Sequence, residues 1–440
     1  MKFIYIFFCL IILINCSFDN KSGIWKNENN PSVKENSLSN FKTLSSTKKT
    51  FNEIIQLEKN TKIIISNKKK ITSWNDIFYN KANNLENFEY NELNQLIFKS
   101  KKISKYPVSN YLLFEKGKVI TTNINGDIII LSTSEVRTLQ RFNFYKKKFK
   151  KKEKFLNIIV EKNTIFVSDN FGYLYAYDYI KDEVIWAKNY KVPFRSNLKI
   201  IKNKLIAGNQ NNDLYFFDKR NGAILSFIPT EDTVLKNQFK NNISVNNLNT
   251  FFINTYGSLY SLDNKTMRVN WFLNFNQSTD INPIDLFNSN EIIYQNDKIV
   301  ISSDQITYVL NNKNGVLNFK KNFGSQIKPV IINDHLFSIT DNNLLISLNL
   351  TTGKIIYSYN INQKIADYLN SKKRQVEVRN IMVVNDKIFI FLKNPYILKF
   401  SIYGNLEEIV KLKNKLNSDP IFVDNTMLYL DKKNKLRIIN

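Results

Sequence analysis

The stretch that decides the fold is "GYLYAYDYIKDEVIW", from Gly172 to Trp186. It reads as a turn residue, an alternating strand ending at Asp178, a short polar gap, and a second strand that ends in an indole. A match of the same length, "GSLYSLDNKTMRVNW", runs from Gly257 to Trp271 and is identical at six positions. The stretch is therefore one copy of an internal repeat and not a lone hairpin.

Weaker copies bring the number of repeat units to eight. They start at Gly126, Asn212, Gln305, Asn343, Pro395 and Asn434. Each unit is preceded by a turn pair and a short β-branched or aromatic run, and successive units start 38 to 52 residues apart. This spacing is typical of four-stranded propeller blades. The sequence predicts an all-β fold, an eight-bladed β-propeller.

Three positions of the unit have a structural explanation. Position seven carries a short polar side chain suited to bonding the turn backbone, as at Asp178, Asp218, Asp263, Asn311 and Asn349. Position eleven carries glycine, which supplies a positive φ, at Gly222, Gly315 and Gly353. Position fifteen carries a flat ring at Trp186, Trp271, Phe319 and Tyr357. We expect these rings to wedge between blades.

The end of the chain predicts how the ring closes. The last unit stops at Asn440, position seven, and so lacks the outer strand of a blade. The segment "NQLIFKSK", Asn94 to Lys101, has a suitable spacing to supply that strand, and pairing the two chain ends removes an exposed sheet edge. We therefore expect the propeller over residues 94–440, and an irregular arm over 51–93 that packs through Trp74.

The first residues predict export. "MKFIYIFFCLIILINC" has a positive Lys2, an apolar run that is short for a membrane span, and Cys16 at its end. The segment Leu13 to Cys16 resembles a lipoprotein cleavage box, so residues 1–16 are a predicted signal peptide and Cys16 the predicted lipidation site. A signal peptide cut elsewhere, or an uncleaved anchor, is the alternative. Residues 17–50 have the composition of a flexible tether.

The charge of the chain does not by itself predict a nucleic-acid partner. The formal charge is +25, but the lysines are spread along the chain, which favours a solvated basic surface. The densest run, Lys146 to Lys154, is expected to be a loop, with contact to anionic lipid head groups as the alternative. Cys9 and Cys16 are the two cysteines, so the chain beyond them has no disulfide or thiolate metal site.

The repeat pattern resembles that of the pyrroloquinoline-quinone (PQQ)-like propellers. Within that group, the quinoprotein alcohol dehydrogenases imply a PQQ cofactor stacked on Trp, a Ca²⁺ held by Glu and Asn, and an Asp base. This chain lacks the long insertions of those enzymes, and its sole histidine, His335, follows Asp334 in the repeated turn slot. We expect His335 to be a surface turn residue. We expect no catalytic residue, cofactor or metal.

A propeller of this length behind a lipoprotein signal resembles the BamB family of outer-membrane lipoproteins. The resemblance implies binding to the POTRA domains of a BamA-like barrel-forming protein, through a loop with two apolar residues followed by Arg. Val192, Phe194 and Arg195 match that pattern and are the predicted partner-binding residues; an ordinary rim arginine is the alternative. The family's acidic pair has no counterpart in "KNQFKNNIS" from Lys236, and the nearest acids are Glu231 and Asp232.

The sequence thus predicts a non-enzymatic scaffold, lipid-anchored on the periplasmic face of the outer membrane, that aids assembly of outer-membrane β-barrel proteins. Its expected partners are a BamA-like protein and unfolded outer-membrane proteins, with no nucleic acid. The alternatives are a PQQ-dependent periplasmic dehydrogenase and a propeller that binds envelope polysaccharide.

Overall fold

The computed structural model describes residues 16–18, 25–27, 51–135, 137–145, 149–231, 241–275 and 286–440. The predicted signal peptide before Cys16, most of the tether, and residues 146–148 lie outside these ranges. The chain divides into two units, Met1–Lys49 and Thr50–Asn440. In the first, β1 (Cys16–Phe18) and β2 (Trp25–Asn27) form an antiparallel pair.

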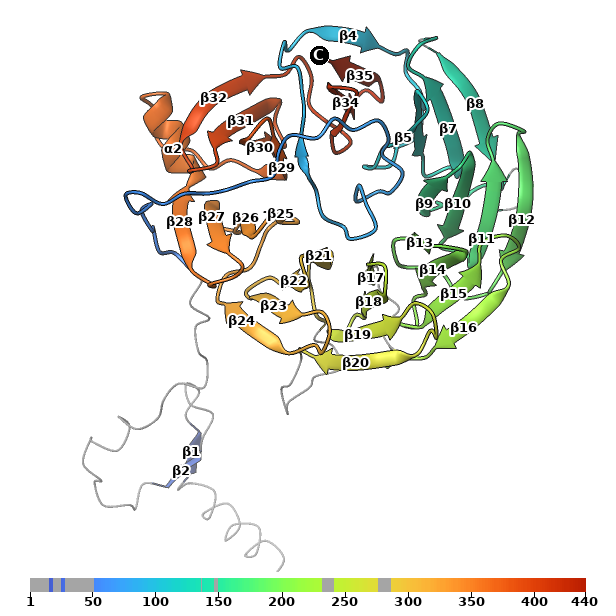
Figure 1. Cartoon of the computed structure of the whole chain (residues 1–440), viewed down its shortest axis with the longest axis horizontal. Coiled ribbons are helices and arrows are strands. Elements are labelled where there is room, and N and C mark those ends of the chain that lie inside the picture. Colours follow the sequence, from blue (N-terminus) through green and yellow to red (C-terminus); the bar gives the residue numbers. More distant parts are fainter. Residues whose placement is uncertain are drawn as a thin grey trace, which may run out of the picture. The chain divides into compact units, whose positions relative to one another are not determined.

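The unit Thr50–Asn440 is a ring of eight antiparallel blades (Figure 1). The inner strands, in order of blades 1 to 8, are β5 (Leu113–Glu115), β9 (Leu156–Glu161), β13 (Lys199–Ile201), β17 (Asn242–Val245), β21 (Ile293–Gln295), β25 (Val330–Ile332), β29 (Val378–Val384) and β33 (Ile421–Val423). The second strands are β6 (Lys118–Thr122), β10 (Thr164–Asp169), β14 (Lys204–Gly208), β18 (Asn249–Ile253), β22 (Lys298–Ser302), β26 (His335–Ile339), β30 (Lys387–Leu392) and β34 (Thr426–Leu430).

The third strands carry the repeat that opened the sequence analysis. They are β7 (Asp127–Ser132), β11 (Tyr173–Asp178), β15 (Leu214–Asp218), β19 (Ser258–Asp263), β23 (Thr307–Asn311), β27 (Leu344–Asn349), β31 (Tyr396–Ser401) and β35 (Leu436–Ile439). The outer strands are β8 (Thr138–Asn143), β12 (Glu183–Asn189), β16 (Ile224–Ile228), β20 (Val269–Asn274), β24 (Leu317–Lys321), β28 (Ile355–Asn360), β32 (Leu406–Lys411) and β4 (Leu96–Lys99). The predicted eight-bladed propeller is confirmed.

An N-terminal strand closes the ring, as predicted. The outer strand of blade 8 is β4, which pairs antiparallel with β35 and places Phe98 opposite Ile438. The two ends of the propeller sequence therefore share one sheet, seen at the top of Figure 1. Because this sheet includes both ends, the last blade is complete and the ring has no open seam.

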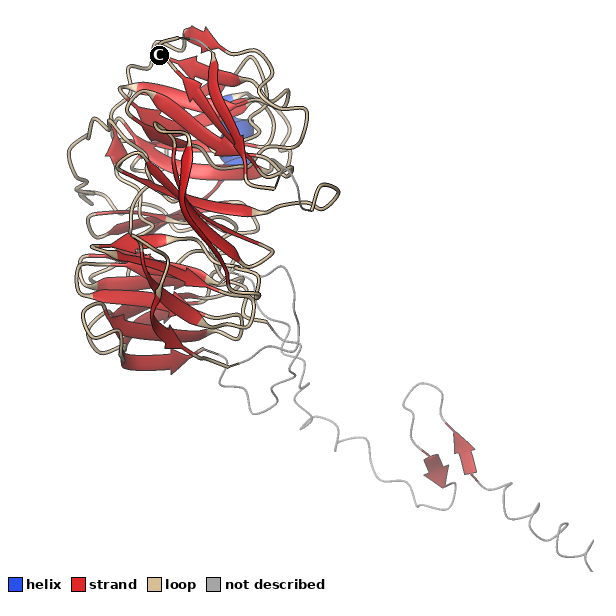
Figure 2. Ribbon diagram, turned by 90° about the vertical axis from the view of Figure 1, so that its right-hand side faces the viewer, coloured by secondary structure: helices blue, strands red, loops and turns tan. Residues whose placement is uncertain are grey.

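Burial falls from the centre of the ring to its rim. All six residues of β7 are buried, whereas β12 has six of its seven residues exposed. The blades pack face to face around the ring, so their central strands are covered on both sides and read as dense apolar runs. Figure 2 shows the ring from the side.

The rings at position fifteen join neighbouring blades. The Trp186 indole lies against Gly222 of the next blade and donates from Nε1 to the Lys219 carbonyl at 3.0 Å. Trp271 makes the same contact with Gly315 and donates to the Asn312 carbonyl at 3.2 Å. The glycine therefore has two functions, since it adopts a positive φ and leaves room for the ring.

A short helix, α2 (Ile361–Tyr368), lies in the connection between blades 6 and 7. Its N-cap is Asn360, whose side chain accepts from the Gln363 amide at 3.1 Å. Among the residues that the structure describes, no helix has the length and hydropathy needed to cross a membrane.

We predict that Gly315→Ala destabilises the propeller more than Gly117→Ala. Both glycines have φ near +70°, so both substitutions carry the same backbone strain. An added Cβ at Gly315 would lie 2.6 Å from Trp271, whereas at Gly117 the nearest atom is 3.8 Å away. The extra cost at Gly315 should be about 1–3 kcal/mol, the usual range for overpacking. Urea unfolding of both variants measures it, and equal midpoints would contradict the proposed contact between blades.

Candidate functional site

The centre of the ring is filled by the chain's own N-terminal arm, residues 51–93. In Figure 1 the arm, in blue, passes from the rim near β28 into the middle of the propeller. Its segment 71–88 contacts every blade at or beside the inner strand. The contacts, from blade 1 to blade 8, join Trp74 to Phe114, Asn75 to Val160, Asp76 to Lys199, Lys81 to Val245, Ala82 to Tyr294, Asn84 to Ile331, β3 (Asn87–Phe88) to β29, and Ile71 to Asp424.

Backbone pairing accounts for several of these contacts. The amides of Val160, Val245 and Tyr294 donate to arm carbonyls at 2.8–3.0 Å. Each inner strand has one edge toward the centre of the ring, and its polar groups need partners once water is excluded. The arm supplies those partners, so it is an integral part of the propeller.

Asparagine side chains supply further partners in the arm. Asn83 donates from Nδ2 to the carbonyls of Ile243 and Ile292, both at 2.9 Å, and so bridges blades 4 and 5. Asn84 donates to the Ile331 carbonyl of blade 6 at 2.8 Å. Two neighbouring side chains therefore hold three blades.

A buried ion pair fixes the arm to blade 3. The Lys199 side chain is 0% exposed, and its Nζ lies 2.6 Å from Asp76 Oδ2 and 2.9 Å from the Asn80 carbonyl. Burial lowers the pKa of Lys199, and the neighbouring Asp76 carboxylate opposes that shift. Removing either partner would leave an uncompensated buried charge, so the pair specifies where the arm lies.

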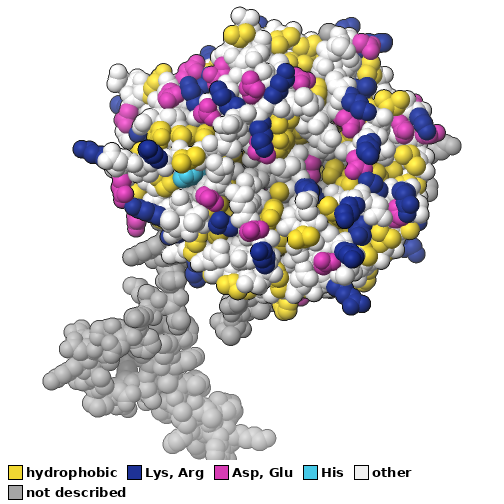
Figure 3. All heavy atoms as spheres, viewed as in Figure 1, with side chains coloured by type: hydrophobic (Ala, Val, Ile, Leu, Met, Phe, Trp, Pro, Cys, Tyr) yellow, Lys and Arg dark blue, Asp and Glu magenta, His cyan; other side chains and the backbone are white. Residues whose placement is uncertain are grey.

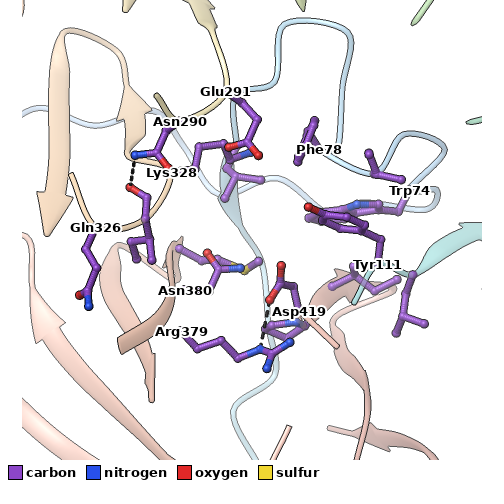
Figure 4. Close-up of a pocket in the computed structure, with 17 residues that line it drawn as sticks. Trp74, Phe78, Tyr111, Asn290, Glu291, Gln326, Lys328, Arg379, Asn380 and Asp419 are labelled. Carbon is purple, nitrogen blue, oxygen red and sulfur yellow. Dashed lines mark hydrogen bonds and ion pairs between the residues drawn. The ribbon is translucent and has the colours of Figure 1, made fainter. Parts of the chain in front are cut away.

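A pocket of about 250 Å³ lies beside the arm at one mouth of the ring (Figure 4). We call it the mouth pocket. Trp74 and Phe78 of the arm line it. The other lining residues include several that lie just before an inner strand or at its first residues. Those with polar or aromatic side chains are Tyr111, Asn290, Glu291, Gln326, Lys328, Arg379, Asn380 and Asp419. The mouth pocket therefore opens on the face where outer strands connect to the next inner strands, which we call the loop face.

The charges of the mouth pocket are of both signs. Arg379 Nε donates to Asp419 Oδ1 at 3.1 Å, and burial raises the pKa of Asp419 against the effect of that arginine. Burial also lowers the pKa of Lys328 to about 8, and its Nζ donates to the Asn83 carbonyl at 2.9 Å. Glu291 is the second carboxylate.

This donor set does not fit the cofactor site that the quinoprotein resemblance implies. A Ca²⁺ ion needs several oxygen ligands and little competing positive charge. Here Asp419 is paired with Arg379, and the Lys328 ammonium shares the pocket with Glu291. Within the described residues, no three His, Cys, Asp or Glu side chains are placed to hold a metal ion.

The predicted partner-binding residues lie beside a second pocket on the same face. This Arg195 pocket measures about 380 Å³, and Phe194, Arg195, Tyr111 and Phe155 are among its lining residues. The loop backbone is held on both sides, because the Arg195 amide donates to the Gly208 carbonyl and its own carbonyl accepts from the Asn241 amide, both at 3.0 Å. The loop is thus presented in one conformation.

The three predicted contact residues differ in accessibility. Phe194 is 2% exposed and packs against Tyr190 and Phe217, so its ring belongs to the core between blades. Val192 and Arg195 are partly exposed. Arg195 Nε is buried with no hydrogen-bond partner, and burial lowers the pKa of this guanidinium. The Nε–H of Arg195 is therefore enclosed, and the partly exposed remainder of the side chain is what an acceptor from outside can reach.

The loop in which the family's acidic pair would lie is mostly outside the described residues, since 232–240 are not described. Glu231 is described, and its carboxylate accepts from Ser258 Oγ at 2.7 Å, Tyr260 Oη at 2.8 Å and Asn254 Nδ2 at 2.6 Å. These hydrogen bonds lower the pKa of Glu231, although burial alone would raise it. Its acceptor atoms are therefore engaged within blade 4 and its neighbour.

His335 is not the surface turn residue that we expected. It is the first residue of β26, is 7% exposed, and pairs with both Ile332 and Asn349. The turn residues are the two before it, so His335 begins a central strand, where most of the residue is covered. Its Nδ1 is buried without a hydrogen-bond partner.

Charged side chains are distributed evenly over the face of the propeller in Figure 3. Lys and Arg lie around the whole ring, with Asp, Glu and apolar side chains between them. A nucleic-acid site would show a continuous basic stripe or patch. This face fits a solvated basic surface.

The family comparison and the structural comparison agree on the type of propeller. A family model described as "Outer membrane protein assembly factor BamB" matches residues 157–359. The structure of BamB from Moraxella catarrhalis has a TM-score of 0.60 at 11% identity, covering 79% of this chain and 99% of that chain. The chain resembles BamB in its repeats and in its fold. The comparison with curated proteins gave no match.

Other PQQ-like and designed propellers are similar to nearly the same degree. The quinohemoprotein alcohol dehydrogenase from Comamonas testosteroni has a TM-score of 0.59 at 11% identity, covering 83% of this chain and 80% of that chain. The computationally designed Ika8 protein has a TM-score of 0.58 at 12% identity, covering 78% and 99%. At these identities the structural likeness shows the fold alone.

We predict that His335 makes the stability of the propeller depend on pH. Burial lowers the pKa of His335, so the folded state disfavours the imidazolium. Above the ordinary pKa of about 6.5 the residue is neutral in both states and has no effect. As the pH falls below that value the unfolded chain binds the proton first, and stability is lost until the folded-state pKa is passed.

Thermal unfolding at pH 7.5 and pH 5.0 measures this effect. His335→Thr is the matched control, because Thr164 and Thr426 occupy the same strand position in blades 2 and 8. The natural chain should lose more stability between the two pH values than the variant does. The same loss in both proteins would show that other groups cause it.

Proposed function

We propose that this protein is a non-enzymatic scaffold of the outer-membrane β-barrel protein assembly (BAM) complex, lipid-anchored at Cys16 on the periplasmic face of the outer membrane. It binds the POTRA region of a BamA-like protein through the loop face and assists the insertion of outer-membrane proteins. The observation that carries this proposal is the match of residues 157–359 to the BamB family model, which includes the Arg195 loop.

The arm-filled ring supports a scaffold role. The inner strands, which surround the channel in a propeller, are covered here by the chain's own segment 71–88. What remains for recognition is the two faces of the propeller and its rim. The Arg195 loop is held to blades 3 and 4 by backbone hydrogen bonds, and its partly exposed guanidinium suits a planar carboxylate of a protein partner.

The likeness to a quinohemoprotein alcohol dehydrogenase makes a PQQ-dependent dehydrogenase the second candidate. The mixed charges of the mouth pocket argue against it, because the Arg379–Asp419 pair and Lys328 occupy the region where a carboxylate-bound divalent cation would lie. For the polysaccharide alternative, we find no specific supporting observation.

We predict that Arg195→Glu lowers recovery of the BamA-like partner roughly tenfold when the protein is pulled down from detergent-solubilised envelopes. Reversing the charge replaces an attraction to a partner carboxylate by repulsion, and one central arginine commonly contributes more than 1 kcal/mol. Arg137→Glu is the control, since Arg137 is exposed and lies in a turn on the opposite face.

Both variants must elute and melt as the natural protein does. Unchanged recovery with a folded Arg195→Glu protein would contradict the docking site. Failure of the natural protein to recover a BamA-like partner would contradict the proposed function itself.

We predict that Cys16 carries the lipid. Metabolic labelling with a fatty acid should label the natural protein, and Cys16→Ala should abolish the label, because acylation in the lipoprotein pathway requires that thiol. Cys9→Ala is the matched control and should leave labelling unchanged. Labelling that persists in Cys16→Ala would refute the assignment.

A further inference from the structure

The arm forms an isolated β-bridge with the outer edge of blade 6 before it enters the ring. Ile55 and Ser358 of β28 exchange both backbone hydrogen bonds, at 3.2 and 2.9 Å. Beside this pair, the Leu57 amide donates to Tyr359 Oη at 2.9 Å, and Phe51 packs against Phe323 at 5.9 Å between ring centroids. The outer edge of a blade therefore accepts an extended segment in this fold.

The amide and carbonyl of Ser358 point away from the blade, and the strand registers show which residues of other blades have the same orientation. Ser358 lies opposite Ile346 of the third strand, one residue after the ring at position fifteen. Phe272 of β20 and Phe227 of β16 hold the same place, opposite Tyr260 and Tyr215. In all three blades, the pairing of the third and outer strands has its register shift at the same place relative to this residue. The amide and carbonyl of Phe227 and Phe272 thus face outward, as those of Ser358 do.

These two edges are open and apolar. Phe227 is 47% exposed and Phe272 is 64% exposed, whereas Ser358, under the arm, is 0% exposed. Within the described residues, β16 and β20 have no strand on their outer side. Apolar neighbours along these strands are also exposed, namely Ile224, Leu225 and Val269. Exposed aromatic side chains in adjacent blades are costly to leave in water.

We propose that the outer edges of blades 3 and 4 bind an extended, unfolded segment with alternating apolar residues by strand addition, which extends along the strand the single β-bridge that the arm makes on blade 6. Backbone hydrogen bonds provide affinity that tolerates many sequences, and Phe227 and Phe272 select apolar side chains at alternate positions. Such segments are what an unfolded β-barrel membrane protein offers, because its strands alternate in this way. That source of the ligand rests on the proposed function, whereas the binding edge does not.

The proposal is tested with purified protein and a fluorescein-labelled, net-neutral twelve-residue peptide in which Val and Phe alternate with Thr. Fluorescence anisotropy should show saturable binding. A peptide with two Thr replaced by Pro should bind at least tenfold more weakly, because proline has no amide hydrogen and interrupts strand pairing.

Variants of the protein locate the edge. Phe227→Thr combined with Phe272→Thr should weaken binding at least fivefold, since threonine keeps the strand propensity but removes both rings. Lys320→Thr is the matched control, because Lys320 occupies the same position on the open edge of blade 5, and it should change affinity less than twofold.

Hydrogen exchange separates strand addition from non-specific apolar adhesion. Bound peptide should slow exchange of the Phe227 and Phe272 amides, as arm pairing should already do for Ser358. Binding without this protection, equal binding of the proline peptide, or no binding at all would overturn the proposal. A dimer that depends on Phe272, detected by sedimentation, would also overturn the proposal, because a second copy of this chain would then occupy the edge. None of these outcomes involves the BamA-like partner.

Discussion

The propeller depends on the contact between its inner strands and the arm that fills the ring. Eight inner strands meet around a centre from which water is largely excluded, and each has backbone groups on the edge that faces inward. The arm satisfies several of them from its own backbone and from Asn83 and Asn84. The Lys199–Asp76 pair, buried and close, then fixes the arm in one position. A ring of repeats becomes a single body because one non-repeating segment contacts every blade.

This constraint also determines where the protein can interact with others. With the centre filled, recognition is left to the two faces and the outer edges of the propeller. On the loop face, Arg195 has a buried Nε without a partner, and the backbone on both sides of it is fixed by hydrogen bonds. At the rim, the arm itself forms a β-bridge with the outer edge of blade 6. A scaffold that holds one folded partner and unfolded chains is consistent with both surfaces.

The blades could be predicted because their physics is local and repeated. Strands buried on both faces give dense apolar runs, the turn at Asp178 needs its short carboxylate, and the ring at Trp186 needs Gly222 beside it. Closure followed from counting strands in the last unit. The position of the arm could not be predicted, because its contacts with the blades join residues from 40 positions apart (Trp74 and Phe114) to 353 positions apart (Ile71 and Asp424) and follow no period. Only Trp74, an indole in a polar segment, indicated that the arm packs.

The site was less predictable than the fold. The pattern at Val192 to Arg195 picked out a loop that lies on the loop face, but the pattern could not show that the Phe194 ring turns into the core. His335 was assigned to a turn because the residues at this place in the other repeats are Lys or Thr, but the place itself can be covered, since His335 is 7% exposed. Lys199 and Lys328 read as ordinary surface lysines in the sequence. Their burial depends on the arm.

The most direct test of the account is native-state hydrogen exchange of the Val245 and Tyr294 amides, whose acceptors are the arm carbonyls of Lys81 and Ala82. If the arm is an integral part of the propeller, these amides exchange only through the global unfolding reaction and follow its dependence on denaturant. Exchange through a small local opening, while the amides of the second strands stay protected, would show that the arm leaves an intact ring and would contradict the account.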